Sequence, residues 1–239
     1  AVKHMCHYRW HYEVNLDAAS KRFAKLFVPK TINKLIWVGP FVLNKAAKAF
    51  KSRMSKRLWV IGSNEITGIS IEESFENLIR LLDKHLEVRP YIFGARPSIA
   101  DFALWGHIYN ANNDVTANDF IQRHAPKLND WIIRMIDPKE KGGFEEWHEL
   151  KPTLLPLIKE EVSEVFLPWV TANNDAVKNN KDELSITLKG RPFEHKVTSV
   201  QRFHAKSFGL LMEHYKTVSQ DQELEEILVE AGAKAYLNA

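Results

Sequence analysis

The stretch from Tyr91 to Trp105 constrains the fold most, because it predicts where a buried helix begins. Ser98 is a favourable N-cap residue, and its hydroxyl can accept a hydrogen bond from the backbone N–H of Asp101. The Asp101 carboxylate can reach back to the cap and also meets the positive end of the helix dipole. Pro97 and Phe102 can form a hydrophobic staple. The residues that follow are mostly apolar, so we expect this helix to run through a core.

Composition favours an all-α protein without a membrane span. The 239 residues suffice for one large or two small domains, and 45% of them are hydrophobic. Only ten are glycine, and alternating strand-like runs are rare. No apolar run reaches about 18 residues, so we expect no membrane partner. The lone Cys6 fits a reducing compartment and predicts a cytoplasmic protein; an idle thiol is a commoner role for it than a reactive one.

The net charge of +3 hides a strong asymmetry along the chain. Eleven bases and no acids lie between Ala18 and Asn64. Such a run is most often a solvated face. It could also form the mouth of a site for an anionic small molecule, a surface for an acidic partner, or a nucleic-acid surface. We expect nucleic acid least, because no motif of a nucleic-acid-binding fold accompanies the bases.

Residues 70–137 predict three helical units joined by short loops, as in a bundle. The strings Ser70–Glu73 and Thr116–Asp119 read as two further capping boxes. After the first box, apolar residues recur at helical spacing and form a core stripe. The members of this stripe are Phe75, Leu78, Leu82 and Leu86. Pro126 begins the last unit, which ends near Asp137.

The C-terminal part predicts more helices and one hairpin. Residues 144–170 read as a helix, and Asn173–Asp182 as a loop. Leu184–Leu188 alternates with a period of two and is followed by Lys189-Gly190, so we expect a small β-hairpin near residues 184–197. Ser199–Val218 predicts a long helix, and a short one follows before the chain ends.

The first predicted helix, residues 3–16, is rich in aromatic and histidine side chains. In a helix, Tyr8 and Tyr12 share one face, and His4, His7 and His11 share another. The three imidazoles could approach a metal, but no acidic or Cys ligand accompanies them, so we expect no metal site. A partly exposed stripe, or a contact with a further domain, is the simpler interpretation.

Four strings of the chain resemble a known family. Tyr91–Phe102 resembles the segment that opens the core helix in the C-terminal domain of cytosolic glutathione transferases, which reads hydrophobic-Gly-x-x-Pro-Ser/Thr-x-Ala-Asp. Arg57–Asn64 and the helix after it look like a bacterial-type branch of that family with a long C-terminal portion. The likeness continues in Gly190–Phe193 and Phe203–Lys206.

The resemblance implies an all-α helical bundle of the glutathione transferase C-terminal type. Residues 1–140 would form this domain, with residues 141–239 as a mainly helical extension packed on it. The chain begins at Ala1, and Met5 already lies in a predicted helix, so we expect an upstream segment, which in the family is a thioredoxin-like domain. That domain would bind the co-substrate glutathione and supply the catalytic residue, so this chain alone should be inactive and contain no catalytic residue.

The family also suggests a role for the first helix, which there lines the pocket for a small hydrophobic electrophile. Its expected wall here is Tyr8, Trp10, His11 and Tyr12. Ser98 and Asp101 are expected to be structural. A homodimer is compatible with the resemblance. The alternative is a non-catalytic scaffold or interaction module with the same fold, which the basic run and the long C-terminal portion favour.

Overall fold

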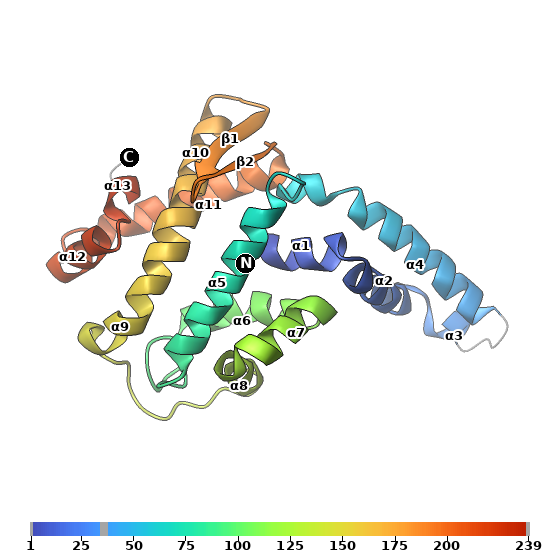
Figure 1. Cartoon of the computed structure of the whole chain (residues 1–239), viewed down its shortest axis with the longest axis horizontal. Helices are drawn as coiled ribbons and strands as arrows, with labels where there is room; N and C mark the ends of the chain where they lie inside the picture. Colours follow the sequence, from blue (N-terminus) through green and yellow to red (C-terminus); the bar gives the residue numbers. More distant parts are fainter. Residues whose placement is uncertain (1, 34–37, 238–239) are drawn as a thin grey trace.

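The computed structural model describes residues 2–33 and 38–237 of the chain, and it is mostly helical (Figure 1). Its described residues contain a single sheet of two antiparallel strands. This confirms the all-α prediction with one small hairpin. No helix in the described ranges is long and apolar enough to span a bilayer.

The helices and strands fall into three groups by their place in the fold. A bundle contains α1 (Val2–His11), α5 (Gly68–Leu86), α6 (Ile99–Ala111), α7 (Val115–His124), α8 (Pro126–Arg134) and α9 (Trp147–Leu157). An arm contains α2 (Glu13–Phe27), α3 (Lys30–Asn33), α4 (Gly39–Ser55) and the 3₁₀ turn η1 (Leu58–Ile61). The C-terminal part contains η2 (Ile158–Phe166), α10 (Leu167–Lys178), β1 (Glu183–Leu188), β2 (Arg191–Lys196), α11 (Ser199–Val218), α12 (Gln222–Glu230) and α13 (Lys234–Leu237).

The bundle is built around α5, whose apolar stripe is buried as predicted. Phe75, Leu78, Leu82 and Leu86 are all buried and share one core with the fully buried Trp131 of α8. The i, i+3, i+7 spacing places these side chains on one side of α5, where α8 and α9 pack. This core therefore depends on the helical periodicity of a single segment.

The predicted capping box forms at the start of α6, and its aspartate has further partners. Ser98 Oγ accepts from the Asp101 backbone N–H at 3.4 Å, and Asp101 Oδ2 accepts from the Ser98 N–H at 2.9 Å. Asp101 Oδ1 accepts from the N–H of Ile92 at 2.9 Å and from Trp131 Nε1–H at 3.0 Å. Asp101 is fully buried. It therefore joins the preceding loop, the start of α6 and α8.

The prediction that α6 runs wholly through a core is wrong. Asp101, Ile108 and Ala111 are buried, whereas Ile99 is 89% and Phe102 is 53% exposed. Trp105 is partly buried, and its Nε1–H donates to a carbonyl of α8 at 3.0 Å. The helix packs against α1 and α8 on one side only. The apolar residues of α6 predicted burial, but the sequence of α6 does not show whether another helix packs on each of its faces.

The two other predicted capping boxes are wrong, because both helices begin earlier. α5 begins at Gly68, and the Asn64 side chain accepts from the N–H groups of Ile66 and Thr67 just before it. α7 begins at Val115, so Thr116 lies inside the helix. The Asn64 turn sets the start of α5, whereas at the start of α7 the N–H of Thr116 donates to Asn15 Oδ1 of a distant segment.

Residues 147–178 form one long run of α9, η2 and α10, in which η2 is π-helical. The predicted loop at Asn173–Asp182 is therefore wrong up to Lys178. Asn173 is fully buried, and its Nδ2 donates to the carbonyl of Gln201 on α11 at 2.8 Å. Its polarity indicated solvent, but its Nδ2 finds a partner on a distant helix, while its Oδ1 has none among the described residues.

The hairpin forms where it was predicted. β1 pairs with β2 so that Leu188 lies opposite Arg191, which leaves a two-residue turn. Lys189 and Gly190 both have positive φ, of 46° and 78°, as a type I′ turn requires. The strands bury Leu184, Leu188 and Phe193 in a second core with α10 and α11.

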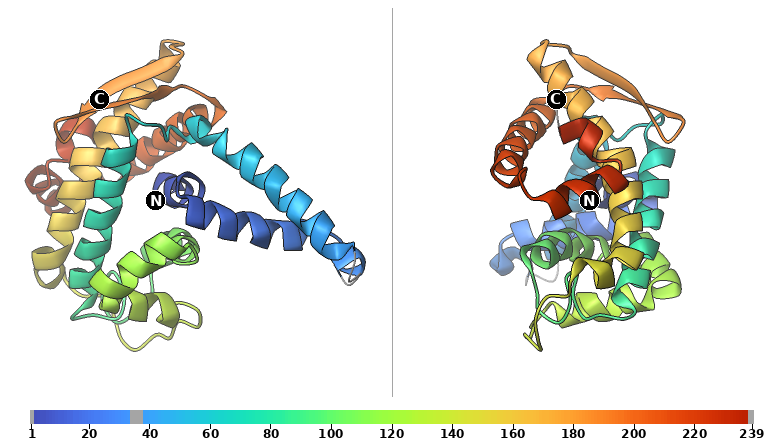
Figure 2. Two further views of the ribbon diagram at one scale, coloured as in Figure 1. Left: turned by 45° about the vertical axis from the view of Figure 1, so that its right-hand side comes forward. Right: turned by 90° about the vertical axis from the view of Figure 1, so that its left-hand side faces the viewer.

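The arm is an antiparallel pair of α2 and α4 that projects away from the bundle (Figure 2). Aromatic side chains hold it together, since the ring centroid of Phe23 lies 5.9 Å from that of Phe50 and 5.7 Å from that of Trp10. The Nζ atom of Lys51 is 2.8 Å from the Asp17 carboxylate and also binds Glu13. Most other cations of the arm face solvent.

Replacing Asp101 with alanine should destabilise the protein strongly. The Asp101→Ala variant leaves the Ile92 and Ser98 N–H groups and Trp131 Nε1–H without their buried acceptor. We expect the free energy of unfolding to fall by about 3–5 kcal/mol, measured by urea denaturation. The control is Asp119→Ala, an exposed residue of α7, which should change it by less than about 0.5 kcal/mol. Equal effects of the two variants would contradict this role of Asp101.

The buried His195 should make stability depend on pH. Its Nε2 accepts from Trp169 Nε1–H at 2.9 Å, so it must stay unprotonated in the folded protein. Burial, and then the nearby Lys3, lower the pKa of His195 from 6.5 to about 4. The unfolded chain takes up this proton near pH 6.5. Stability should therefore be full above that pH and fall by about 3 kcal/mol as the pH drops to about 4.

The test is the free energy of unfolding at several pH values for the natural protein and for His195→Gln. The glutamine can still accept from Trp169 but does not titrate. From about pH 7 to about pH 4 the natural protein should lose about 3 kcal/mol relative to the variant. Parallel curves would show that another group governs acid unfolding.

Candidate functional site

The four predicted pocket residues lie on two different sides of α1. The rings of Tyr8 and Tyr12 stack with centroids 5.3 Å apart, and the exposed His11 stacks on His7 at 4.8 Å. Trp10 is buried on the other side, in the small core that joins α1 to the arm. Helical rotation explains this, because residue 10 lies nearly opposite residue 8 around α1, and Tyr12 follows α1 as the N-cap of α2. The structure brings together Tyr8, His11 and Tyr12 but not Trp10.

A polar cluster of His7, Tyr12, Ser63 and Glu72 lies beside this stack. His7 Nδ1 is 2.8 Å from Ser63 Oγ, and His7 Nε2 is 3.0 Å from Glu72 Oε1. The Tyr12 hydroxyl donates to the same Glu72 oxygen at 2.5 Å. Ser63 and Glu72 were not predicted as site residues, because Glu72 was assigned to a capping box and Ser63 was noted only as part of the string Arg57–Asn64.

The electrostatics of this cluster fix how its protons are arranged. Burial, and then the hydrogen bond to Glu72, raise the pKa of Tyr12 to about 12, so its hydroxyl stays protonated. Burial lowers the pKa of His7. The neutral ring fits with its proton on Nε2, because the Glu72 carboxylate can only accept. Ser63 then donates to Nδ1.

Ser63, His7 and Glu72 have the residue types of a catalytic triad but not its accessibility. Ser63 is 2% exposed, and its N–H and that of Asn64 both already donate within the chain. The nucleophile would thus lack both access and nearby donors for an oxyanion. We interpret the cluster as one that fixes ring orientations. A ligand can reach Glu72, whose side chain is 34% exposed, and the edges of His11 and Tyr12.

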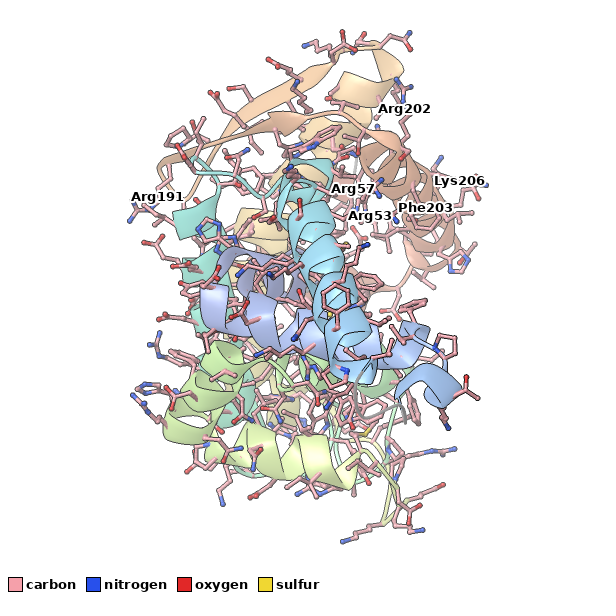
Figure 3. The ribbon with its side chains drawn as sticks, turned by 90° about the vertical axis from the view of Figure 1, so that its right-hand side faces the viewer. Arg53, Arg57, Arg191, Arg202, Phe203 and Lys206 are labelled. Carbon is pink, nitrogen blue, oxygen red and sulfur yellow. The ribbon has the colours of Figure 1, made fainter. Side chains whose placement is uncertain are left out.

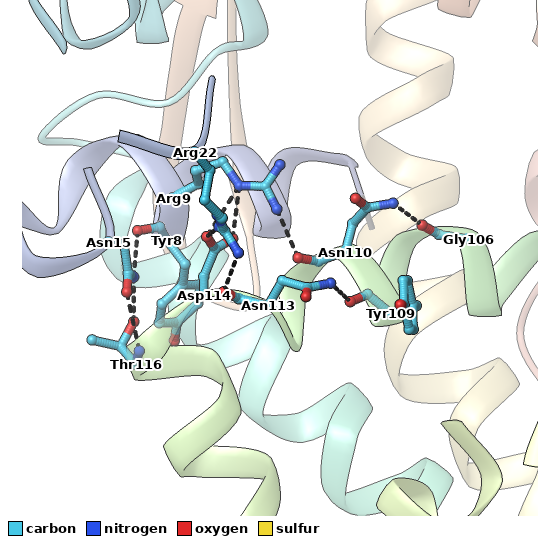
Figure 4. Close-up of polar contacts among 10 residues, drawn as sticks. All are labelled: Tyr8, Arg9, Asn15, Arg22, Gly106, Tyr109, Asn110, Asn113, Asp114 and Thr116. Carbon is cyan, nitrogen blue, oxygen red and sulfur yellow. Dashed lines mark hydrogen bonds and ion pairs between the residues drawn. The ribbon is translucent and has the colours of Figure 1, made fainter. Parts of the chain in front are cut away.

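A buried ion pair holds α1 against the bundle (Figure 4). Arg9 Nε donates to Asp114 Oδ2 at 2.8 Å, and another Arg9 nitrogen donates to the Asn110 carbonyl at 2.7 Å. Arg22 of α2 donates to the same carboxylate at 3.0 Å. Asp114 is fully buried. Its carboxylate therefore connects α1, α2 and the turn between α6 and α7.

Asn15 adds a second anchor next to this pair (Figure 4). Its Nδ2 donates to the Tyr8 carbonyl at 2.7 Å and to Thr116 Oγ1 at 2.5 Å, and its Oδ1 accepts from the Thr116 N–H at 3.1 Å. Asn15 is fully buried. The bend after α1 is therefore tied to α7, and the aromatic side chains of α1 are held in place from both sides.

Two hollows of the described surface lie away from this site. One, of about 420 Å³, is lined by residues of η2, β1 and the last helices, among them Ser163, Lys189 and Tyr236. The other, of about 300 Å³, surrounds Pro90 and Arg134. None of the four predicted pocket residues lines either hollow.

The described part of the chain gives little support for a metal site or for a reactive cysteine. It contains no group of three or more His, Cys, Asp or Glu arranged to hold a metal. His4, which was grouped with His7 and His11, turns its Nε2 to Ser74 Oγ at 3.1 Å instead. Cys6 is partly buried, and burial raises the pKa of its thiol, so the reactive thiolate is disfavoured.

Comparison with known proteins finds a family model that matches part of the arm and most of the bundle. The model of the glutathione S-transferase C-terminal domain family matches residues 46–134. The matched segment includes the second half of α4, all of α5 to α8, and the Ser98–Asp101 cap. It supports a protein similar to glutathione transferases. Comparison of the chain with curated proteins and with solved structures gives no match.

Breaking the Arg9–Asp114 pair should loosen α1 and destabilise the fold. The Asp114→Ala variant leaves a buried guanidinium without its carboxylate, so we expect a loss of about 3–5 kcal/mol in the free energy of unfolding. The control, Asp17→Ala, removes an exposed partner of Lys51 and should cost less than about 1 kcal/mol. Chemical denaturation measures both. A small effect of Asp114→Ala would mean that α1 does not depend on this pair.

Proposed function

Because residues 46–134 match the C-terminal domain of glutathione S-transferases, we propose that the chain is the helical, hydrophobic-substrate-binding portion of a glutathione transferase-like protein. The whole protein conjugates or reduces small electrophiles with glutathione. The family match is the observation that carries this proposal. A thioredoxin-like domain binds glutathione and supplies the catalytic side chain, and no residue of this chain is catalytic.

In this proposal the exposed side of α1 forms part of the wall for the electrophile. The partly buried Tyr12 stacks on the buried Tyr8, and His11 lies exposed next to it, so Tyr12 and His11 present the surface of the wall and Tyr8 supports it. The Tyr12 hydroxyl already donates to Glu72 and one ring face stacks on Tyr8, so the ring edge is the part that a ligand can reach. Such a wall favours flat apolar or aromatic electrophiles. Trp10 takes no part in it and instead fixes the arm.

The two apolar cores support residues 1–140 as the transferase-like domain and residues 141–239 as its extension. One core is made of side chains from α1 and α5 to α8, with Leu150 and Leu154 of α9 added. The other is made mainly of side chains from α10, the hairpin and α11. The boundary of the first core therefore lies slightly beyond residue 140. The lone cysteine fits the cytoplasmic location that we propose.

A second candidate is a non-catalytic scaffold with the same fold. The observation that favours it is the long surface of cations on the arm, which no electrophile pocket requires. The long C-terminal portion also offers area for partners. The two candidates differ in whether the full-length protein binds glutathione.

The full-length protein should conjugate glutathione to 1-chloro-2,4-dinitrobenzene, a small aromatic electrophile. The Tyr12→Ala variant should raise the KM for the electrophile about tenfold and leave the KM for glutathione unchanged, because it removes one ring of the wall. Tyr12→Phe retains the ring and should stay within about twofold. Tyr109→Ala, a half-exposed tyrosine on α6, is the matched control.

Thermal unfolding of each variant separates a loss of binding from a loss of folding. If the full-length protein neither turns over electrophiles nor binds glutathione, the scaffold is the correct reading. If turnover occurs but Tyr12→Ala behaves like Tyr109→Ala, the transferase proposal holds and the wall lies elsewhere.

A further inference from the structure

A basic surface forms where the end of α4 meets the first half of α11 (Figure 3). It carries Arg53 from the end of α4, Arg57 from the turn that follows, and Arg202 and Lys206 from α11. All four side chains are exposed, and none of them forms an ion pair with another described residue. We call these four residues the basic surface. Its charge is uncompensated within the described chain.

The tertiary structure extends the basic run of residues 18–64 onto α11. Thr198, the N-cap of α11, donates through Oγ1 to the Val60 carbonyl in η1 at 3.0 Å. This contact places the start of α11 beside the end of the arm. The first part of α11, up to Met212, contains no acidic residue. Cations from sequence positions far apart therefore share one face.

An apolar stripe continues from the basic surface along α11. Phe203 is 67%, Leu210 53% and Leu211 44% exposed. Spacings of seven and eight residues place them along one side of the helix. The opposite side buries Ala205, Phe208 and Tyr215. From Phe203 to Leu211 the stripe is about 12 Å long.

We propose that this face binds an acidic amphipathic α-helix of a partner protein. The apolar side of the partner helix packs on Phe203, Leu210 and Leu211, and its carboxylates face the basic surface. Charge complementarity selects an acidic partner, because the four cations have no acids of their own. The stripe has two leucines and a single aromatic ring, which favours a protein helix over a nucleic acid, because a nucleic acid would need several stacking rings and phosphate contacts along the whole face.

The two parts of the face contribute differently. Phe203 is large, rigid and central to the contact, so its burial supplies much of the affinity. The four cations are exposed, so they mainly speed association and choose the partner, and salt weakens their effect. The inference does not depend on transferase activity, because none of the residues that form this face belongs to the proposed wall for the electrophile.

The test measures fluorescence anisotropy with a labelled synthetic peptide of about 20 residues, long enough for a stable helix. Its leucines recur at i, i+3, i+4 and i+7, and glutamates fill the other face. A second peptide has the same composition in shuffled order. An oligodeoxythymidine of equal net charge and vesicles of phosphatidylcholine with phosphatidylserine represent nucleic acid and membrane. The protein is the full-length chain.

Two pairs of variants separate the apolar and the ionic contributions. Phe203→Ser with Leu210→Ser should weaken binding of the amphipathic peptide at least about tenfold, whereas Val229→Ser, an exposed valine of α12, should change it less than about twofold. Arg53→Glu with Arg202→Glu should also weaken it at least about tenfold. Its control is Lys84→Glu with Lys127→Glu, which changes the net charge equally at exposed positions of α5 and α8. Circular dichroism checks that every variant folds.

Three results together would support the proposal: tight binding of the amphipathic peptide, weak binding of the shuffled one, and weaker peptide binding by both the Phe203/Leu210 and the Arg53/Arg202 double variants. Equal binding of both peptides would overturn it, because charge alone would then suffice. Tighter binding of the oligonucleotide or of the vesicles would overturn it in favour of that ligand. If both double variants bound the amphipathic peptide as well as the natural protein does, the contact would lie elsewhere and the proposal would be overturned. A failure of the natural protein to bind the amphipathic peptide would also overturn it.

Discussion

The carboxylate of Asp101 is the interaction on which the rest of the bundle depends. It accepts hydrogen bonds from the start of its own helix, from the N–H of Ile92 and from Trp131. A buried carboxylate is unfavourable unless donors surround it, and here donors from three separate segments do so. The same contact therefore begins α6, closes the preceding loop and positions α8. Because these three partners are satisfied together, the bundle has one favourable arrangement of these segments.

The candidate site follows from how α1 is held on that bundle. One side of α1 is fixed by Arg9 and Asp114, and the other by His7 and Glu72. Both contacts are polar and at least partly buried, so they restrict the rotation of α1 more than apolar packing would. As a result Tyr8 and Tyr12 are stacked toward one side and Trp10 is directed to the other. The polar contacts thus decide which aromatic rings a ligand can reach.

The C-terminal part changes what the basic run of the arm can do. Along the sequence the run is an ordinary solvated stretch, and Lys51 is indeed paired with acids of α2. The contact between Thr198 and Val60 brings α11 to its end. Unpaired cations and exposed apolar side chains then lie on one face, which neither segment has alone. The extension therefore adds an interaction surface to a fold whose bundle resembles that of the transferases.

The sequence alone determined the features that depend on local spacing. The box at Ser98, the stripe of α5, the turn at Lys189-Gly190 and the length of α11 each depend on neighbours a few residues apart. Tertiary structure decided the rest. Whether the apolar face of α6 has a neighbour, whether Asn173 is buried, and which partner Glu72 binds all depend on segments far away in sequence. Hydrogen bonds and burial between distant segments have no local pattern, so only the folded chain could show that Trp10 leaves the predicted pocket wall.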